Sequence, residues 1–284
     1  MREELHKRQA IWRVAALCVA WGCLYFDVLR RLAGDWIEDP NYSHGFLVPA
    51  IAGYAWWIER EKLALLPRRP GTWLGLAIMA LALILLWAGL LGAELFAGRL
   101  SLVISLAALI VYFGGLEWLK ALLFPLGILL LAIPPPQILF QRVTFPLQLL
   151  ASELATGAIR SMGVPALREG NIIELAHLRL QVVEACSGIR SLISLLTLAV
   201  AWARFREEVW WRRMALILAV APIAVVANAG RVAAAGILAH YRGSAAAEGF
   251  LHYFSGLALF LVAVGLFLVL SRLLRFPRRK ERQS

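Results

Sequence analysis

The chain of 284 residues is 61% hydrophobic and 17% charged, and its 29 Lys and Arg outnumber its 18 Asp and Glu, which gives a net charge of +11. Soluble domains contain roughly 45–50% apolar and about 25% charged residues. The composition therefore excludes an ordinary soluble protein, and the glycine, proline and cysteine contents exclude collagen-like, disordered and disulfide-scaffold chains.

Eight runs along the chain meet or approach the length of about 20 mostly apolar residues that a spanning helix needs. They are residues 11–32, 45–58, 72–92, 98–116, 118–133, 188–204, 212–231 and 253–274. The fifth run ends at Ile133, because the three prolines that follow cannot continue a helix. The sequence thus predicts an all-α polytopic membrane protein with about eight transmembrane helices, in a single domain of residues 1–284.

The charges lie unevenly about these runs and predict the orientation of the chain. Eight spans place both termini on one side, together with segments 1–13, 59–70, 117–120, 204–213 and 272–284. These segments hold 19 basic and 8 acidic residues, whereas the rest of the chain holds 10 of each. The positive-inside rule therefore places both termini in the cytoplasm. Nucleic-acid binding, the other meaning of a basic chain, has no further support, and membrane lipid accounts for the basic tail at 272–284.

The longest predicted connection, residues 134–187, falls on the extracytoplasmic side and greatly exceeds the median loop of about 4–6 residues. Between residues 137 and 162, apolar residues recur at helical spacing, which predicts one or two amphipathic helices at the membrane interface. They are Leu139, Val143, Leu147, Leu150, Leu154 and Ile159. A turn at Glu169-Gly170-Asn171 and alternating strings at 171–175 and 178–183 predict a small β-hairpin that leads directly to Cys186.

Cys186 lies between that strand-like run and the start of the sixth predicted span. A thiol there faces the unpaired N–H groups and positive dipole end of a helix, a setting that favours the nucleophilic thiolate. Gly188 would allow close backbone approach, and the N–H groups around Ser187 could receive an acyl oxyanion. The alternative is that Cys186 is a small residue packed at a span boundary.

Two further segments bring polar side chains to the predicted outer ends of spans. Asn228 and Arg231 are three residues apart and share a helical face, and Arg231 is either functional or an interfacial arginine with its head in water. His252, at the start of the last span, suits general acid–base chemistry, although a histidine bonded to backbone fits the same position. With Cys186 they supply the nucleophile, base and fixed cation that acyl transfer through a thioester requires.

Motifs along nearly the whole chain resemble those of the exosortase/archaeosortase family of multi-span cysteine transpeptidase-like enzymes. The most specific is the block Ala185-Cys186-Ser187-Gly188-Ile189-Arg190-Ser191, followed by an N-x-x-R motif at 228–231 and an H-x-x-x-G motif at 252–256. Further matching segments are Asn41–Pro49, Ile133–Pro136 and Gly170–Ile173.

The resemblance implies eight spans and a catalytic site of Cys186, Arg231 and His252 on the outer face. It implies cleavage of the C-terminal sorting tails of secreted proteins, in which a Pro-Glu-Pro motif precedes one span and a basic cluster. The reaction would proceed through a thioester acyl-enzyme and end in transfer to an unknown acceptor nucleophile. It also implies the inner (cytoplasmic) membrane of a Gram-negative bacterium, a site facing the periplasm, and an association with exopolysaccharide production.

Three other residues have weaker assignments. His44 belongs to a matching motif on the outer side, where it could line the substrate groove or cap the second span. Glu184 could orient His252 or pair with Arg190. The histidines and cysteines show no metal-ligand spacing, and no glycine-rich phosphate loop is present, so neither a metal nor a cofactor is expected.

Two other functions compete with a cysteine transpeptidase. A transporter or non-enzymatic component of polysaccharide export is one, but transporters commonly carry paired repeats and midplane polar groups, which this sequence lacks. A purely hydrolytic intramembrane protease is the other. The sequence leaves transfer and hydrolysis open, because the difference is whether an acceptor or water reaches the thioester.

Overall fold

The structure, a computed structural model, describes residues 2–39, 41–92, 95–176, 178–182, 189–243, 245 and 257–275. The described chain is mostly helical, with one three-stranded sheet. It divides into two compact units, Met1–Pro134 and Pro135–Ser284.

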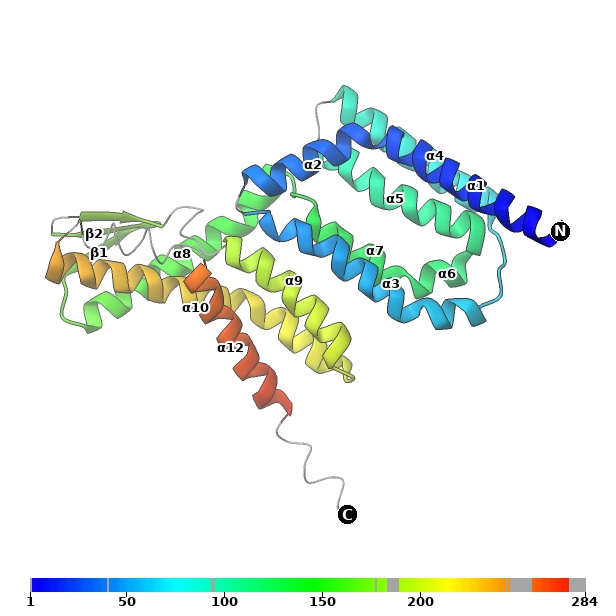
Figure 1. The fold of residues 1–284 in the computed structure, drawn as a ribbon. Coiled ribbons are helices and arrows are strands. Elements are labelled where there is room, and N and C mark those ends of the chain that lie inside the picture. The colour runs from blue at the N-terminus through cyan, green and yellow to red at the C-terminus, as the bar shows by residue number, and fades with distance from the viewer. Residues whose placement is uncertain are drawn as a thin grey trace, which may run out of the picture. The chain divides into compact units, whose positions relative to one another are not determined.

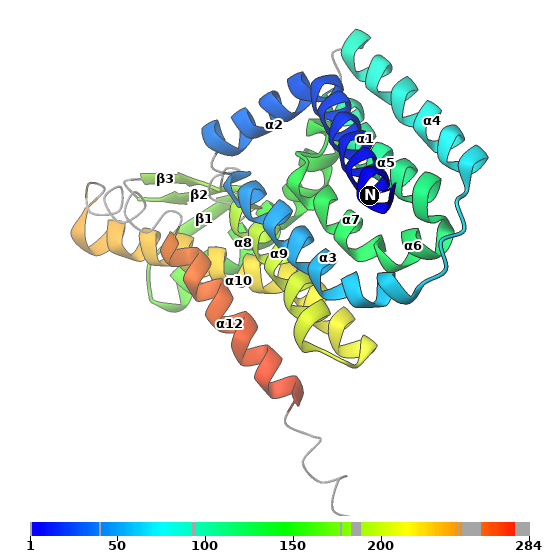
Figure 2. The same cartoon turned by 45° about the vertical axis from the view of Figure 1, so that its right-hand side comes forward.

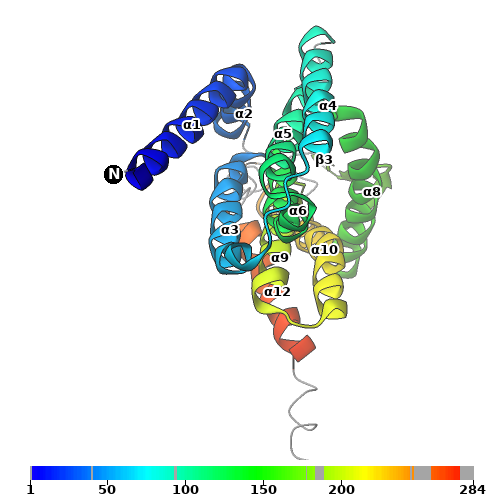
Figure 3. The ribbon, with the colours of Figure 1, turned by 90° about the vertical axis from the view of Figure 1, so that its right-hand side faces the viewer.

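The first unit is entirely helical where it is described (Figure 1). Its helices are α1 (Arg2–Leu24), α2 (Phe26–Glu38), α3 (Leu47–Leu65), α4 (Thr72–Leu91), α5 (Leu95–Gly114), α6 (Leu116–Ala121) and α7 (Leu123–Leu129), with short 3₁₀ turns η1 (Ser43–Phe46) and η2 (Leu130–Ala132). Helices α4 and α5 lie side by side in Figures 1 and 3. Gly75 permits this approach, since a Cβ there would lie 2.7 Å from Cα of Tyr112.

Residues 11–32 do not form the one continuous span that their sequence predicts. The helix breaks at Tyr25 and α2 leaves at 64° to α1. Tyr25 is fully buried, and its hydroxyl donates to the carbonyl oxygen of Ser101 at 3.2 Å. Helix α2 then carries charged side chains on Asp27, Arg30, Arg31, Asp35 and Glu38. The break therefore follows from tertiary packing of Tyr25 and from the polarity of the chain beyond it.

The fifth predicted run, 118–133, is also divided, into α6, α7 and η2. The break at Leu122 precedes Pro125, which cannot donate to the carbonyl of Ala121 and whose ring would crowd that carbonyl in a continuous helix. The predicted end at the three prolines is confirmed, because η2 ends at Ala132.

The second unit combines four long helices with the sheet, and its elements are α8 (Gln137–Ser161), β1 (Ala166–Glu169), β2 (Ile172–Leu175), β3 (Leu178–Gln181), α9 (Ile189–Arg206), α10 (Trp210–Arg242) and α12 (Leu257–Arg275). One core joins α8, the sheet and α10 through Ala155, Ile173, Leu180 and Val232. Figures 1 and 2 show the strands against the C-terminal half of α10. The sheet is thereby fixed to the helix that carries Asn228 and Arg231.

Both predicted strands form, and they pair antiparallel as β2 and β3. The structure adds β1, which pairs with β2 on its other side. The predicted turn at Gly170-Asn171 exists, but it joins β1 to β2 and does not join the two predicted strands. Gly170 has φ of 63°, which a glycine adopts without steric cost.

Helix α8 confirms the amphipathic helix predicted between residues 137 and 162, as one element of 25 residues. Four residues of its apolar stripe face outward, since Leu139, Val143, Leu150 and Leu154 are all exposed, whereas Leu147 and Ile159 pack against the core. The rest of the buried face is made of small or polar residues: Thr144, Gln148, Ala151, Ser152, Ala155 and Thr156. This arrangement suits a helix that turns its polar face to protein and its apolar face to lipid.

Helices α9, α10 and α12 form a second cluster, centred on Leu195, Leu216, Ala263 and Phe267 (Figure 3). Glu207, between α9 and α10, is buried and accepts a hydrogen bond from Nε of Arg275 at 2.8 Å. Its backbone carbonyl accepts another from Nε of Arg213 at 2.8 Å. The end of α12 is thereby held to the α9–α10 connection.

Four helices of the described chain are long and apolar enough to span a membrane, namely α4, α5, α10 and α12. The number rises to six if α1 with α2, and α7–η2 with α8, each count as one broken span. The predicted total of eight is therefore not confirmed. Helices α3 and α9 lie where the second and sixth spans were expected, but both contain several charged residues.

Candidate functional site

Most of the residues predicted for the site fall outside the described part of the chain. Cys186 and His252 belong to this group, as do Glu184, Ser187 and Gly188. The backbone places Arg190 in the first turn of α9, but its side chain is outside the description. The structure describes Asn228, Arg231 and the elements that adjoin Cys186.

The chain on both sides of Cys186 is fixed in the way the sequence predicts, with a strand before it and a helix after it. Val182 follows β3, is fully buried, and donates its N–H to the carbonyl of Asn171 at 2.8 Å. In return, Nδ2 of Asn171 donates to the carbonyl of Val182 at 3.1 Å. Helix α9 begins at Ile189. Six residues thus connect an anchored strand end to a helix N-terminus.

Arg231 lies within α10, because that helix continues to Arg242 and does not end at residue 231 as predicted. The Ala-rich sequence after Arg231 favours this continuation. Arg231 is 6% exposed and lines a cavity of about 320 Å³. The other lining residues are apolar or glycine, from α10 (Val226, Ala227, Gly230, Ala234) and α12 (Leu259, Val262, Leu266). A guanidinium in such surroundings interacts strongly with any negative charge that enters.

Asn228, one turn before Arg231, is fully buried. Neither Nδ2 nor Oδ1 of its carboxamide has a hydrogen-bond partner among the described residues. A buried carboxamide left unsatisfied costs about 1–3 kcal/mol for each polar atom. We therefore expect its partners to be a substrate, a water molecule or a part of the chain outside the described ranges.

His44 lies in η1 of the first unit and is 7% exposed. Its Nε2 is 3.1 Å from the carbonyl oxygen of Leu131, and Nε1 of Trp36 donates to the neighbouring carbonyl of Ala132 at 2.9 Å. A Cβ at Gly45 would overlap the Trp36 indole. These contacts give the motif a structural role at the end of η2, and a role for His44 in the substrate groove stays a prediction.

Burial lowers the pKa of His44 from 6.5, although hydrogen bonds to the backbone of Leu131 and Asn41 oppose the shift. Because the pKa is lowered in the folded state, the unfolded state binds the proton first as the pH falls. The contribution of His44 to the free energy of unfolding is therefore complete above about pH 6.5 and declines below it. The melting temperature in detergent should therefore fall more between about pH 7.5 and pH 5 for the wild type than for His44→Gln. Equal pH dependence in the two proteins would show that His44 does not couple folding to protonation.

The buried polar face of α8 was not foreseen. Thr144, Gln148, Ser152 and Thr156 recur every four residues, and α8 packs against α10 along its length. Ser152 uses its hydroxyl to donate to the carbonyl of Gly170 at 2.9 Å, which ties α8 to the β1–β2 turn. The four-residue spacing of these polar residues is itself visible in the sequence, but the apolar stripe beside it is the more prominent pattern.

The described ranges contain no cluster of three His, Cys, Asp or Glu side chains of the kind that binds a metal ion. Comparison with known families matches residues 36–269 to the transmembrane exosortase family (Exosortase_EpsH). No curated protein and no solved structure matches the chain. The family match covers most of the sequence and includes Cys186, Asn228, Arg231 and His252. The protein therefore belongs to the transmembrane exosortases, as its motifs had suggested.

Proposed function

We propose that the protein is a membrane-embedded cysteine transpeptidase that removes C-terminal sorting tails from secreted proteins. The match of residues 36–269 to the transmembrane exosortase family carries this proposal, because it includes the Cys186 block and the Arg231 and His252 motifs. The substrate tail has a Pro-Glu-Pro motif, one span and a basic cluster, as the resemblance to exosortases implies.

The first chemical step is acylation of Cys186. His252 takes the thiol proton, the Sγ thiolate attacks the carbonyl carbon of the scissile peptide bond, and the carbonyl oxygen becomes an oxyanion in the tetrahedral intermediate. Arg231 stabilises this oxyanion. The C–N bond then breaks, His252 gives its proton to the leaving amine, and the substrate is left as a thioester on Cys186.

The second step releases the substrate. A nucleophile of the acceptor gives its proton to His252 and attacks the thioester carbon, and the C–S bond breaks to regenerate Cys186. An acceptor nucleophile gives transfer, whereas water gives hydrolysis and a free carboxylate. Both reactions pass through the same thioester.

The surroundings of Arg231 support its role. Its cavity is lined by apolar side chains, and a low dielectric strengthens the attraction between a guanidinium and a developing oxyanion. The buried carboxamide of Asn228, which has no partner in the described ranges, suits a group that hydrogen-bonds substrate or a catalytic side chain.

The proposed site faces the periplasm from the inner membrane, and both termini are cytoplasmic. The basic segments around 59–70, 204–213 and 272–284 support this orientation. Helix α8 and the sheet, which together precede Cys186, would guide the extended substrate toward the thiol. A non-enzymatic role in polysaccharide export is the competing function, and it requires no reactive thiol.

A membrane-impermeant maleimide tests both the reactivity of Cys186 and the side of the membrane on which it lies. The chain has three cysteines, so Cys18→Ala with Cys23→Ala leaves Cys186 as the single thiol. In spheroplasts at neutral pH, we expect this protein to be labelled faster than a reference peptide thiol, because the helix N-terminus favours the thiolate.

The matched control moves the thiol away from the helix N-terminus, through Cys186→Ala combined with Leu167→Cys at an exposed position of β1. This control should be labelled more slowly, since its thiol does not adjoin a helix N-terminus. Labelling of Cys186 only after the membrane has been permeabilised would place the thiol in the cytoplasm and end the proposed mechanism.

A further inference from the structure

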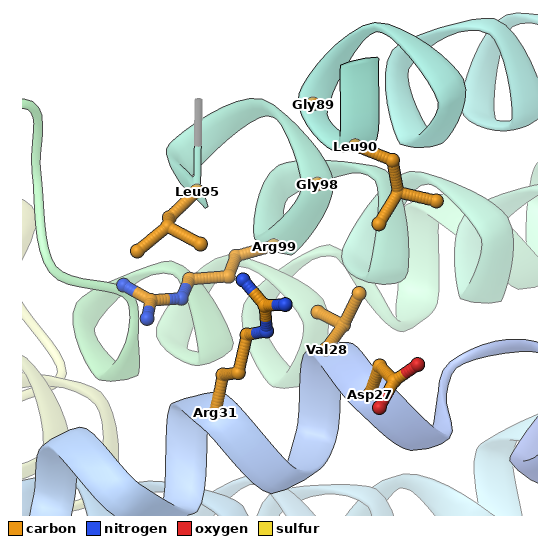
Figure 4. A pocket seen from close by; sticks show the side chains of 8 residues that line it. All are labelled: Asp27, Val28, Arg31, Gly89, Leu90, Leu95, Gly98 and Arg99. Carbon is orange, nitrogen blue, oxygen red and sulfur yellow. The ribbon is translucent and has the colours of Figure 1, made fainter. Parts of the chain in front are cut away.

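A second cavity, of about 260 Å³, lies in the first unit between α2 and the consecutive ends of α4 and α5. Figure 4 shows the side chains of Arg31, from α2, and Arg99, from α5, directed into the same space. The cavity belongs to the unit that does not contain Cys186, Arg231 or His252. It is therefore separate from the proposed catalytic residues in the chain.

The described charged residues on and beside this cavity leave one positive charge in excess. On α2, Asp27, Arg31 and Asp35 are spaced by four residues and share a face. Asp35 is paired with the buried Arg99, whose Nη2 lies 2.5 Å from its Oδ2, and Asp27 is 3.9 Å from Nε of Arg30. Arg31 has no ion pair or hydrogen bond within the described residues, and Glu94 lies outside them.

The remaining walls of the cavity are apolar, formed by Val28, Leu90 and Leu95 together with glycine backbone. Leu90 and Leu95 stand at the ends of α4 and α5, two helices that are long and apolar enough to span a membrane. The ends of such helices meet the lipid headgroups. The cavity therefore places a guanidinium that has no partner among the described residues beside an apolar surface, at the depth where lipid phosphate and acyl chain meet.

Gly98 keeps part of the cavity open. It lies inside α5, where glycine is a poorer helix former than alanine. It is buried, yet a Cβ built on it would meet no atom within 4 Å, so no neighbouring helix requires its small size. The empty space beside Gly98 is the cavity that it lines.

We propose that this cavity binds the phosphate of an anionic phospholipid. Arg31 holds the phosphate, Arg99 is kept in place beside it by Asp35, and the first carbons of the lipid lie against Val28, Leu90 and Leu95. A phosphodiester with an uncharged headgroup carries one negative charge, which matches the one excess positive charge that the described residues leave at the cavity. The fork of a guanidinium suits phosphate oxygens.

Titration of the purified protein with phosphatidylglycerol, followed by native mass spectrometry, tests the proposal. Arg31→Gln should weaken the tightest lipid-binding event at least about tenfold, as loss of a charge-assisted hydrogen bond implies. Gly98→Leu should also weaken it, by filling the cavity, without lowering the melting temperature, because leucine is the better helix former. Arg142→Gln is the charge-matched control: Arg142 is exposed on α8 and does not line the cavity, so binding should stay within about twofold.

Two further ligands separate the possible sources of phosphate. Phosphatidylcholine should bind more weakly than phosphatidylglycerol, and millimolar inorganic phosphate should not displace phosphatidylglycerol. Displacement by inorganic phosphate would indicate a soluble-phosphate site instead. Equal losses of phosphatidylglycerol affinity in Arg31→Gln and Arg142→Gln would indicate unspecific charge attraction. If Arg31→Gln and Gly98→Leu bound lipid as the wild type does but processed substrate poorly, the cavity would be a peptide site. Each of these three results would overturn the proposal.

Discussion

Cys186→Ala should abolish processing of a substrate that carries a sorting tail, with a loss of at least about 10³-fold, because it removes the atom that forms the thioester. The measurement is the size of an epitope-tagged substrate in cells that express either the wild type or the variant. We expect no other thiol to replace Cys186, since Cys18 and Cys23 lie in α1, within the first predicted span and not on the predicted outer face.

Cys18→Ala and Cys23→Ala are the matched controls and should process the substrate at the wild-type rate. Cys186→Ser should be nearly inactive, because a hydroxyl is a much weaker nucleophile than a thiolate and one imidazole rarely compensates. Each variant must first accumulate in the membrane at the wild-type level. Full processing by correctly inserted Cys186→Ala would return the protein to the export-component alternative.

Arg231→Lys should lower processing by about 10²-fold or more, although it keeps the positive charge. The planar guanidinium can give two parallel hydrogen bonds to one oxygen-bearing group, whereas an ammonium acts as a point charge on a flexible stem. Because Arg231 is 6% exposed, lysine cannot recruit water easily to make up the missing bond. The initial rate of substrate cleavage at saturating and at low substrate measures the effect.

Arg242→Lys is the control on the same helix, at an exposed position of its last turn. Its rate should stay within about twofold of the wild type, as expected for a surface substitution. If Arg231→Lys behaved in the same way, Arg231 would be an interfacial arginine without a role in transition-state stabilisation.

Several elements of both units could be predicted from local patterns. The three prolines at 134–136 end a helix for a reason contained in proline itself. The alternation at 172–175 and 178–181 becomes two paired strands because one face of each must be buried, and Ile173 and Leu180 are buried accordingly. Strand β1 was missed because residues 166–169 are mostly exposed and its sequence Ala-Leu-Arg-Glu does not alternate.

The elements that escaped prediction depend on contacts distant in sequence. Tyr25 breaks the first apolar run because it packs against α5, at Ser101, and no residue near Tyr25 signals this contact. The polar face of α8 is buried against α10 and the sheet, whereas a pattern derived from soluble proteins would bury the leucines. A lipid-facing helix reverses that rule, and the pattern alone does not say which solvent a face meets.

The candidate site was foreseen only in part. The three-residue spacing of Asn228 and Arg231 predicts a shared helical face, and their burial on α10 agrees with this. The sequence did not predict that α10 continues past Arg231, nor that Asn228 would be buried without a partner in the described ranges. The positions of Cys186 and His252 relative to Arg231 stay a prediction.

Trapping the acyl-enzyme with hydroxylamine is the most direct test of a thioester on Cys186. Hydroxylamine attacks thioesters, so mass spectrometry of the processed substrate should find a C-terminal hydroxamate in place of the natural end. This product should be absent with Cys186→Ala. A substrate that is cleaved by the wild type but ends only in a free carboxylate, even at saturating hydroxylamine, would contradict the thioester mechanism.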